Sequence, residues 1–375
     1  GSSQWRLSLD VPQALAGAPA PPARLDVQSD LVGTAITLPA PLGKDAATPQ
    51  PLSLQAPLPV GKGEIALTLG ELMRLRGRMG ADNTMTGLIQ LGTGADAPLP
   101  AEGLGVVGAS DTLDAAGWIG FAAKGEGAGG LRAVDLRVAR LDLLGSEFPD
   151  TRLRLQRQAD HTQVQLLGPA IEGAVRIPSA LEQGVQGRFE RLHWPEKPPA
   201  PEPSAAGAEA IALADEEVPG QDPAALPPLD FTVKDLRMGA MALGQAELRT
   251  TPVAQGMHVD RFSTRARGMQ LTASGDWLRA GEGRSRSRFD VDFSARSLGE
   301  LLGAFGLAGM VEEGEIKGKL QGSWAGSPGA FALARFEGRL RADVGEGQLL
   351  EVEPGGGGRV LGLISLAEIP RRLSL

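Results

Sequence analysis

Three histidines are the side chains of this sequence best suited to acid–base or metal chemistry, because the chain contains no cysteine. His161, His193 and His258 lie far apart along the chain, and none stands in an HxH or HExxH spacing. Zinc ligands usually occur in such short spacings or include cysteine, so no metal site is expected. The lack of cysteine also excludes disulfides and thiolate nucleophiles.

Carboxylates are the other candidates for catalysis, because a glycosidase needs only two acids. Glu312, Glu313, Glu351 and Glu353 could supply such a pair, but only 4% of the residues are aromatic and could stack on sugars. Solvated charges at strand edges are the more ordinary role. Since a GxSxG nucleophile motif is also absent, we expect no enzyme, no catalytic residue and no cofactor.

Two glycine-rich segments imitate nucleotide-binding motifs. Gly125-x-Gly127-x-x-Gly130 matches the dinucleotide fingerprint, but a helix-like segment precedes it and a strand-like one follows, the reverse of what the motif needs. The run from Gly355 to Gly358 lacks the Lys-Ser/Thr of a phosphate loop. Both are interpreted as flexible turns.

The net charge of −8 is concentrated in one segment. Residues 195–229 carry seven acids and one base, a net charge of −6 that leaves −2 for the rest. Nucleic-acid binding needs a basic face interleaved with aromatic residues, and none is present. No apolar run approaches the ~18 to 20 residues of a membrane-spanning helix.

Alternation of apolar and polar residues is the main pattern of the chain. It recurs in WRLSLDV from Trp5, EIALTL from Glu64, TRLRLQ from Thr151, TQVQLL from Thr162 and RFDVDFSA from Arg288. Period two over short runs predicts strands with one apolar face, and the Gly, Pro, Asn and Asp between them predict hairpin turns. Helices are expected only at residues 112–124, 298–310 and 359–366.

So few helices cannot cover so many strands. We therefore predict a mainly β fold: an extended, antiparallel, curved sheet, or β-groove meander, whose apolar face is closed by another sheet, wound into a solenoid or left open for an apolar ligand. Candidate groove residues are the alternate apolar positions Leu67, Leu69, Val138, Leu153, Leu155, Val164, Leu166, Val233, Val291 and Phe293.

The chain divides at its Pro-, Ala- and acid-rich segment. Residues 1–3 resemble a tag-removal scar, residues 4–194 and 230–375 are expected to be two β-groove segments, and residues 195–229 a disordered loop. The sequence from Val134 also resembles the sequence from Phe231, since both hold an Asp-Leu-Arg step followed by Leu-Gly and a second strand. Either this is an internal repeat, or any two meanders would look alike.

The C-terminal third and the N-terminal region carry motifs with a recognisable order. SLGELLGAFGL from Ser297 is followed by a Trp-x-Gly-x-Pro step at Trp324 and by Leu-Gly-Leu-x-Ser-Leu at Leu361. SDLVGTAITLPAPLGKDA from Ser29 contains a Leu-Pro-x-Pro-Leu-Gly-Lys segment. Together these motifs resemble the YhdP family of AsmA-like envelope proteins over most of the chain.

The resemblance implies a bridge-like lipid-transfer protein that is anchored in the inner membrane of a Gram-negative bacterium and crosses the periplasm. Phospholipid would be its ligand, on the way to the outer membrane. Contacts with both membranes would be made by regions outside this chain, which we expect to be a fragment without the family's N-terminal anchor and C-terminal end. Unidentified envelope protein partners are compatible with this role.

Two other functions stay open at the level of sequence. A closed structural or adhesion module of the cell envelope would have packed sheets, a dry interior and no lipid. A carbohydrate-active β-solenoid enzyme would need two acids within about 10 Å in a cleft lined by aromatic side chains.

Overall fold

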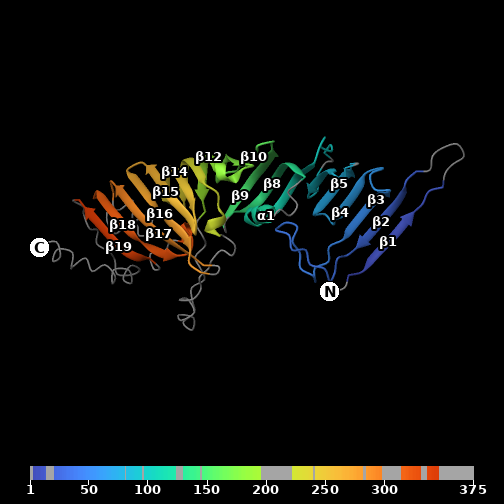
Figure 1. Ribbon diagram of the computed structural model, residues 1–375, viewed down its shortest axis with the longest axis horizontal. Helices are drawn as coiled ribbons and strands as arrows, with labels where there is room; N and C mark the ends of the chain where they lie inside the picture. The colour runs from blue at the N-terminus through green and yellow to red at the C-terminus, as the bar shows by residue number, and fades with distance from the viewer. Residues whose placement is uncertain are drawn as a thin grey trace, which may run out of the picture.

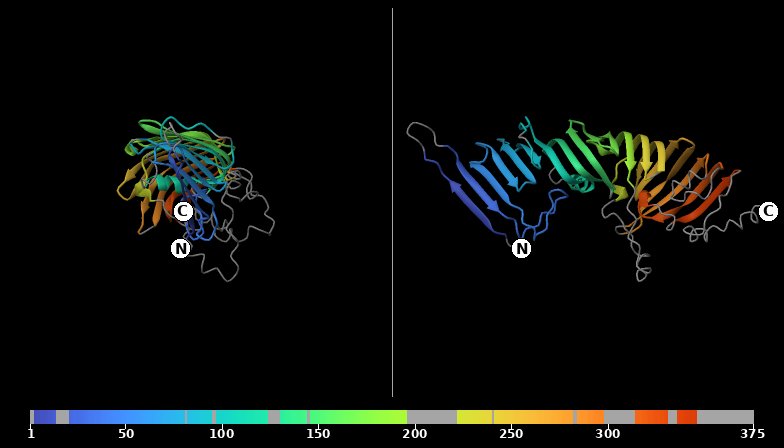
Figure 2. Two further views of the ribbon diagram at one scale, coloured as in Figure 1. Left: turned by 90° about the vertical axis from the view of Figure 1, so that its right-hand side faces the viewer. Right: turned by 180° about the vertical axis from the view of Figure 1, so that it is seen from behind.

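The computed structural model describes residues 3–13, 21–80, 82–94, 97–123, 130–143, 146–195, 222–239, 241–281, 284–297, 314–330 and 336–345. These residues form one sheet of nineteen strands, with β1 and β19 at opposite ends of the long axis (Figure 1). At about 4.8 Å per strand such a sheet extends for about 90 Å. It is not closed into a barrel, and its strands follow a common arc when the molecule is viewed end-on (Figure 2).

The strands range from five to thirteen residues in length. In chain order they are β1 (Trp5–Asp10), β2 (Ala23–Ser29), β3 (Leu52–Leu58), β4 (Ile65–Leu69), β5 (Met73–Met79), β6 (Met85–Leu91), β7 (Leu104–Asp114), β8 (Leu131–Leu143), β9 (Ser146–Arg157), β10 (His161–Leu167), β11 (Ile171–Pro178), β12 (Val185–Trp194), β13 (Leu229–Met238), β14 (Met241–Val253), β15 (Gly256–Ala266), β16 (Met269–Arg279), β17 (Ser285–Ala295), β18 (Ile316–Ala325) and β19 (Glu337–Val344).

Each strand pairs with the next strand along the chain. Most pairs are antiparallel, as short hairpin connections require. The pairs β6–β7, β7–β8 and β12–β13 are parallel. A parallel neighbour needs a crossover, and between β7 and β8 this is the helix α1 (Ala115–Ala123).

Bulges bend the central strands at a common level. The register shifts between Glu172 and Gly173 in β11 and between Val233 and Leu236 in β13. Asp150 in β9 has a φ of 44° without a shift of register. Gly244 in β14 has a φ of 69° at another shift. A bulge increases the local bend and twist of a strand. Aligned on neighbouring strands, these bulges form a crease along one side of the sheet.

The largest hydrophobic cluster lies along this crease. Phe148 and Ile171 are fully buried there, and the Phe148 ring meets Trp194 edge-on at 5.4 Å between centroids. Trp118 of α1 packs against the same cluster, which puts the helix on this side of the sheet. A second cluster contains Phe289 stacked on Trp324 at 5.5 Å.

The predicted β class and curved, open sheet are confirmed, with the correction that three strand pairs are parallel. The helix expected at residues 112–124 is α1, but its first three residues belong to β7, which pairs with β8 up to Asp114. The helices expected at residues 298–310 and 359–366 lie outside the described residues. So does the greater part of the acid-rich loop, residues 196–221.

The two similar sequences occupy equivalent places in the sheet. The Asp-Leu-Arg steps at Asp135 and Asp235 lie in β8 and β13, and each of these strands pairs in parallel with the strand before it and antiparallel with the strand after it. Because β12 pairs with β13, the described strands on either side of residues 195–229 form one continuous sheet. The division into two segments remains a prediction.

Candidate functional site

One face of the sheet carries an unbroken row of apolar residues. Opposed residues of paired strands project to the same face, so the row can be followed from strand to strand. The central row contains one residue from each strand: Leu7, Val27, Leu54, Leu67, Leu75, Ile89, Val106, Val134, Leu155, Val164, Val175, Gly187, Phe231, Leu248, Phe262, Ala273, Val291, Leu320 and Leu340. Every member is apolar or glycine.

A second row follows the same face, two residues along each strand toward the crease. Its members are Leu52, Leu69, Met73, Leu91, Gly108, Leu136, Leu153, Leu166, Gly173, Phe189, Val233, Ala246, Thr264, Leu271, Phe293, Gly318 and Ala342. Thr264 is its single polar member. The two rows make the apolar face at least two side chains wide along most of the sheet.

The opposite face is polar over the same length. The polar row is Arg6, Gln28, Ser53, Thr68, Arg74, Gln90, Val107, Asp135, Arg154, Gln165, Ala174, Arg188, Thr232, Glu247, Ser263, Thr272, Asp292, Lys319 and Arg341. Only Val107 and Ala174 are apolar. The sheet therefore presents one face suited to water and one suited to hydrocarbon.

The central row is partly accessible along most of its length. Most of its members are half-buried, and the two at the ends of the sheet, Leu7 and Leu340, are 66% and 61% exposed. A partly exposed apolar surface of this length is unusual for a water-facing protein, and such surfaces are typical of interaction sites.

All ten residues predicted from the sequence lie on the apolar face, in the central row, in the second row or beside it. Six of them are half-buried and partly accessible: Leu67, Leu153, Leu155, Val164, Val291 and Phe293. A different group is buried against protein along the crease side: Leu69, Val138, Leu166 and Val233. That any of them contacts lipid remains a prediction.

Phenylalanine rings on the apolar face lie over glycines of the neighbouring strand. A Cβ added to Gly187 would stand 2.8 Å from Cδ1 of Phe231 and 3.0 Å from Cε2 of Phe189. Gly318 likewise leaves room for the ring of Phe293. The rings can therefore lie flat on the sheet and do not project far from the apolar face. The sequence interpretation missed these glycines, although isolated glycines within strand patterns are a signal of close approach.

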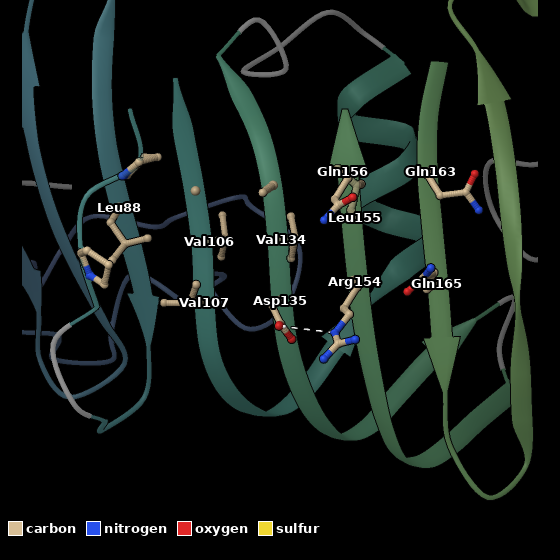
Figure 3. A pocket seen from close by; sticks show the side chains of 14 residues that line it. Leu88, Val106, Val107, Val134, Asp135, Arg154, Leu155, Gln156, Gln163 and Gln165 are labelled. Atoms are coloured by element: carbon tan, nitrogen blue, oxygen red, sulfur yellow. Dashed lines mark ion pairs between the residues drawn. The ribbon is translucent and has the colours of Figure 1, made fainter. Parts of the chain in front are cut away.

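The polar face contains a hollow of about 390 Å³ beneath the segment that joins β6 to β7 (Figure 3). Leu88, Pro98 and Val107 line one part of it, and side chains of β8 to β10 line the rest. The Asp135 carboxylate accepts two hydrogen bonds of 2.7 Å from Arg152 and lies 3.4 Å from Nε of Arg154. The hydrogen bond from Arg152 is the main reason that the pKa of Asp135 is below its usual range.

The three histidines also lie on the polar face, each hydrogen-bonded to an aspartate. The pairs are His161–Asp160 at 2.8 Å, His193–Asp235 at 2.7 Å and His258–Asp276 at 2.7 Å. The hydrogen bond from His193 lowers the pKa of Asp235. Within the described part of the chain, no group of three potential ligands could hold a metal ion. Glu312, Glu313, Glu351 and Glu353 lie outside the described residues.

These features define a class: an elongated, open β-sheet scaffold with one apolar and one polar face. The sequence pattern of the YhdP protein family matches residues 1–375, and the chain belongs to this family of envelope proteins. The family is not known as enzymatic. No curated protein and no solved structure matches the chain. Among the described helices, none has the length and apolar character needed to cross a membrane.

Proposed function

We propose that the protein is a lipid-transfer scaffold whose apolar face shelters the acyl chains of phospholipids between the inner and outer membranes. The observation that carries the proposal is the central row, in which nineteen consecutive strands each contribute an apolar residue or glycine to one accessible line. The family membership supports the same function. In this proposal the chain is the periplasmic portion of an inner-membrane-anchored envelope protein.

The physical basis is the match between the face and an acyl chain. Each CH₂ removed from water contributes about 0.8 kcal/mol, so a chain lying along the row offsets much of the cost of leaving a bilayer. Neighbouring positions present similar Leu, Val, Ile and Phe surfaces, and a lipid that moves by one strand exchanges one apolar contact for another. The head group remains in water beside the open face. The transfer requires no chemical step and no catalytic residue.

The closed structural module has less support. It requires a second sheet or a covering layer over the apolar face, whereas the described residues form one open sheet whose central row is accessible. The carbohydrate enzyme would require a cleft lined by aromatic side chains, and the hollow of the polar face has no aromatic lining residue.

The test compares charges placed on the two faces. Leu155→Glu with Val291→Asp puts two charges in the central row, and Gln156→Glu with Gln321→Glu puts two on the polar face of β9 and β18. Native mass spectrometry and lipid extraction should find phospholipid on the wild type and on the polar-face variant. The central-row variant should lose it, because a buried carboxylate is costly beside an acyl chain. Equal lipid content in the two variants would refute the assignment of the apolar face.

A further inference from the structure

The connection between β2 and β3 is not a hairpin turn. Residues 30–50, which we call the strap, extend along the sheet until their tip reaches α1 (Figure 1). The carbonyl of Ala40 accepts a 2.8 Å hydrogen bond from Nε1 of Trp118 and a 3.3 Å one from the backbone N–H of Asp114. Pro39 lies close to α1, because a Cβ added to Gly117 would be 3.0 Å from the Cβ of Pro39.

The conformation of the strap is determined by its own residues. Nζ of Lys44 donates hydrogen bonds to the carbonyls of Leu31, Thr34 and Asp45 at 3.0, 2.6 and 2.8 Å. Ile36 and Lys44 exchange two backbone hydrogen bonds of 2.9 and 3.0 Å. Three charge-assisted hydrogen bonds from one ammonium group stabilise a defined conformation of the strap rather than a flexible linker.

The strap packs on the crease side of the apolar face. Its Leu42 packs against the crease cluster that includes Leu91. In β4 the second-row residue Leu69 is 5% exposed, whereas Leu67, two residues away on the same face, is half-buried. In β6, Leu91 is 5% exposed and Ile89 is half-buried. At β4 and β6 the second-row residue is thus buried and the central-row residue partly exposed, whereas the second-row residue of β5, Met73, is half-buried.

We propose that the strap and α1 form a side wall that confines bound lipid to the central row at β4 and β6. The binding site there is one row wide, formed by Leu67 and Ile89, and its ligand is an extended acyl chain. This inference rests on the proposed function, since it concerns where on the apolar face the lipid lies. Rows on one strand are about 6.6 Å apart, so the wall halves the width available to hydrocarbon.

The absence of cysteine allows a direct test. Four single-cysteine variants are treated with a phospholipid that carries a maleimide near the end of one acyl chain. The variants are Ile89→Cys and Leu91→Cys in β6, and Leu67→Cys and Leu69→Cys in β4. Positions 89 and 67 should be labelled. Positions 91 and 69 should react at least about tenfold more slowly, because a covered thiol reacts only when the structure opens locally. Equal rates at 89 and 91, and at 67 and 69, would overturn the wall.

Release of the strap provides the converse measurement. Lys44→Met removes the three hydrogen bonds, and added to Leu91→Cys it should raise labelling at position 91 about tenfold. Lys62→Met, at an exposed residue of the turn between β3 and β4, is the matched control and should leave the rate unchanged. An unchanged rate in the Lys44 variant, with circular dichroism like that of the wild type, would contradict the role of the strap.

A further cysteine separates failure of the wall from failure of the proposed function. Leu320→Cys lies in the central row at β18, far along the sheet from the strap. Labelling at 320 together with equal labelling at 89 and 91 would refute the wall alone. A lack of labelling at both 320 and 89, with both thiols reactive toward a small water-soluble maleimide, would refute lipid binding on the apolar face.

Discussion

The ring of Phe293 in β17 occupies the space that a side chain at Gly318 of β18 would fill. The two residues are opposed on the apolar face, and the ring lies over the glycine rather than projecting from the sheet. Gly187 bears the same relation to Phe231, which is its partner in β13. The glycines thus allow aromatic residues to contribute apolar area without obstructing the surface.

Gly318→Val should destabilise the sheet locally. The new side chain displaces the Phe293 ring, and overpacking of this kind costs about 1–3 kcal/mol. Amide hydrogen exchange of β17 and β18 should accelerate accordingly. Adding Phe293→Ala should restore part of the loss by making room. Gly329→Ala is the control, because a Cβ there would meet nothing nearer than Oγ of Ser327 at 4.0 Å. Independent, additive effects of the first two changes would argue against this contact.

Lys44→Met should weaken the strap without unfolding the sheet. It leaves three carbonyl groups without the ammonium donor, and hydrogen bonds to charged groups contribute about 1.5–3 kcal/mol. Hydrogen exchange at Ile36 and Lys44, which bond to each other through the backbone, should speed up while β15 and β16 remain protected. Protection of the strap equal to that in the wild type would show that the ammonium group is dispensable.

Thr264→Val should be neutral or should stabilise the protein by about 1 kcal/mol. Thr264 is 4% exposed, and its hydroxyl has no hydrogen-bond partner among the described residues. Valine has nearly the same shape and removes a buried polar group from the second row. Thermal unfolding, with Thr272→Val on the polar face as the control, measures the effect. A clear loss of stability would indicate that the hydroxyl has a partner.

The stabilising effect of Asp135 should depend on pH. Its hydrogen bonds from Arg152 lower its pKa from the ordinary value of 3.8, so the folded state favours the charged form. The contribution is therefore complete above the unfolded pKa and is lost as the pH falls through the lower folded pKa. For a pair that is partly exposed, we expect roughly 0.5–1 kcal/mol. Urea unfolding of wild type and Asp135→Asn should differ at pH 7 and converge as the pH falls below the lowered pKa of Asp135; a constant difference would contradict the mechanism.

The residues that form the apolar face were largely predictable because strand periodicity is local. Leu153 and Leu155 alternate with arginine and glutamine within a few residues, and period two alone predicts that both leucines face one way. The glycines that leave room for the phenylalanine rings were not identified, because each ring comes from a neighbouring strand. The parallel pairs were also missed, because no local pattern specifies how a crossover returns to the sheet.

The alternation of side chains thus determined by itself that this protein is a β-sheet with one apolar and one polar face. Tertiary structure alone decided which apolar residues remain accessible. Leu67 and Leu69 have the same local pattern, yet only Leu69 is buried. The strap, whose Leu42 packs on the hydrophobic cluster of that side, is docked by the hydrogen bond between Trp118 and Ala40, which are 78 residues apart. Periodicity carries no information about contacts at such separations, since these depend on how the whole chain folds.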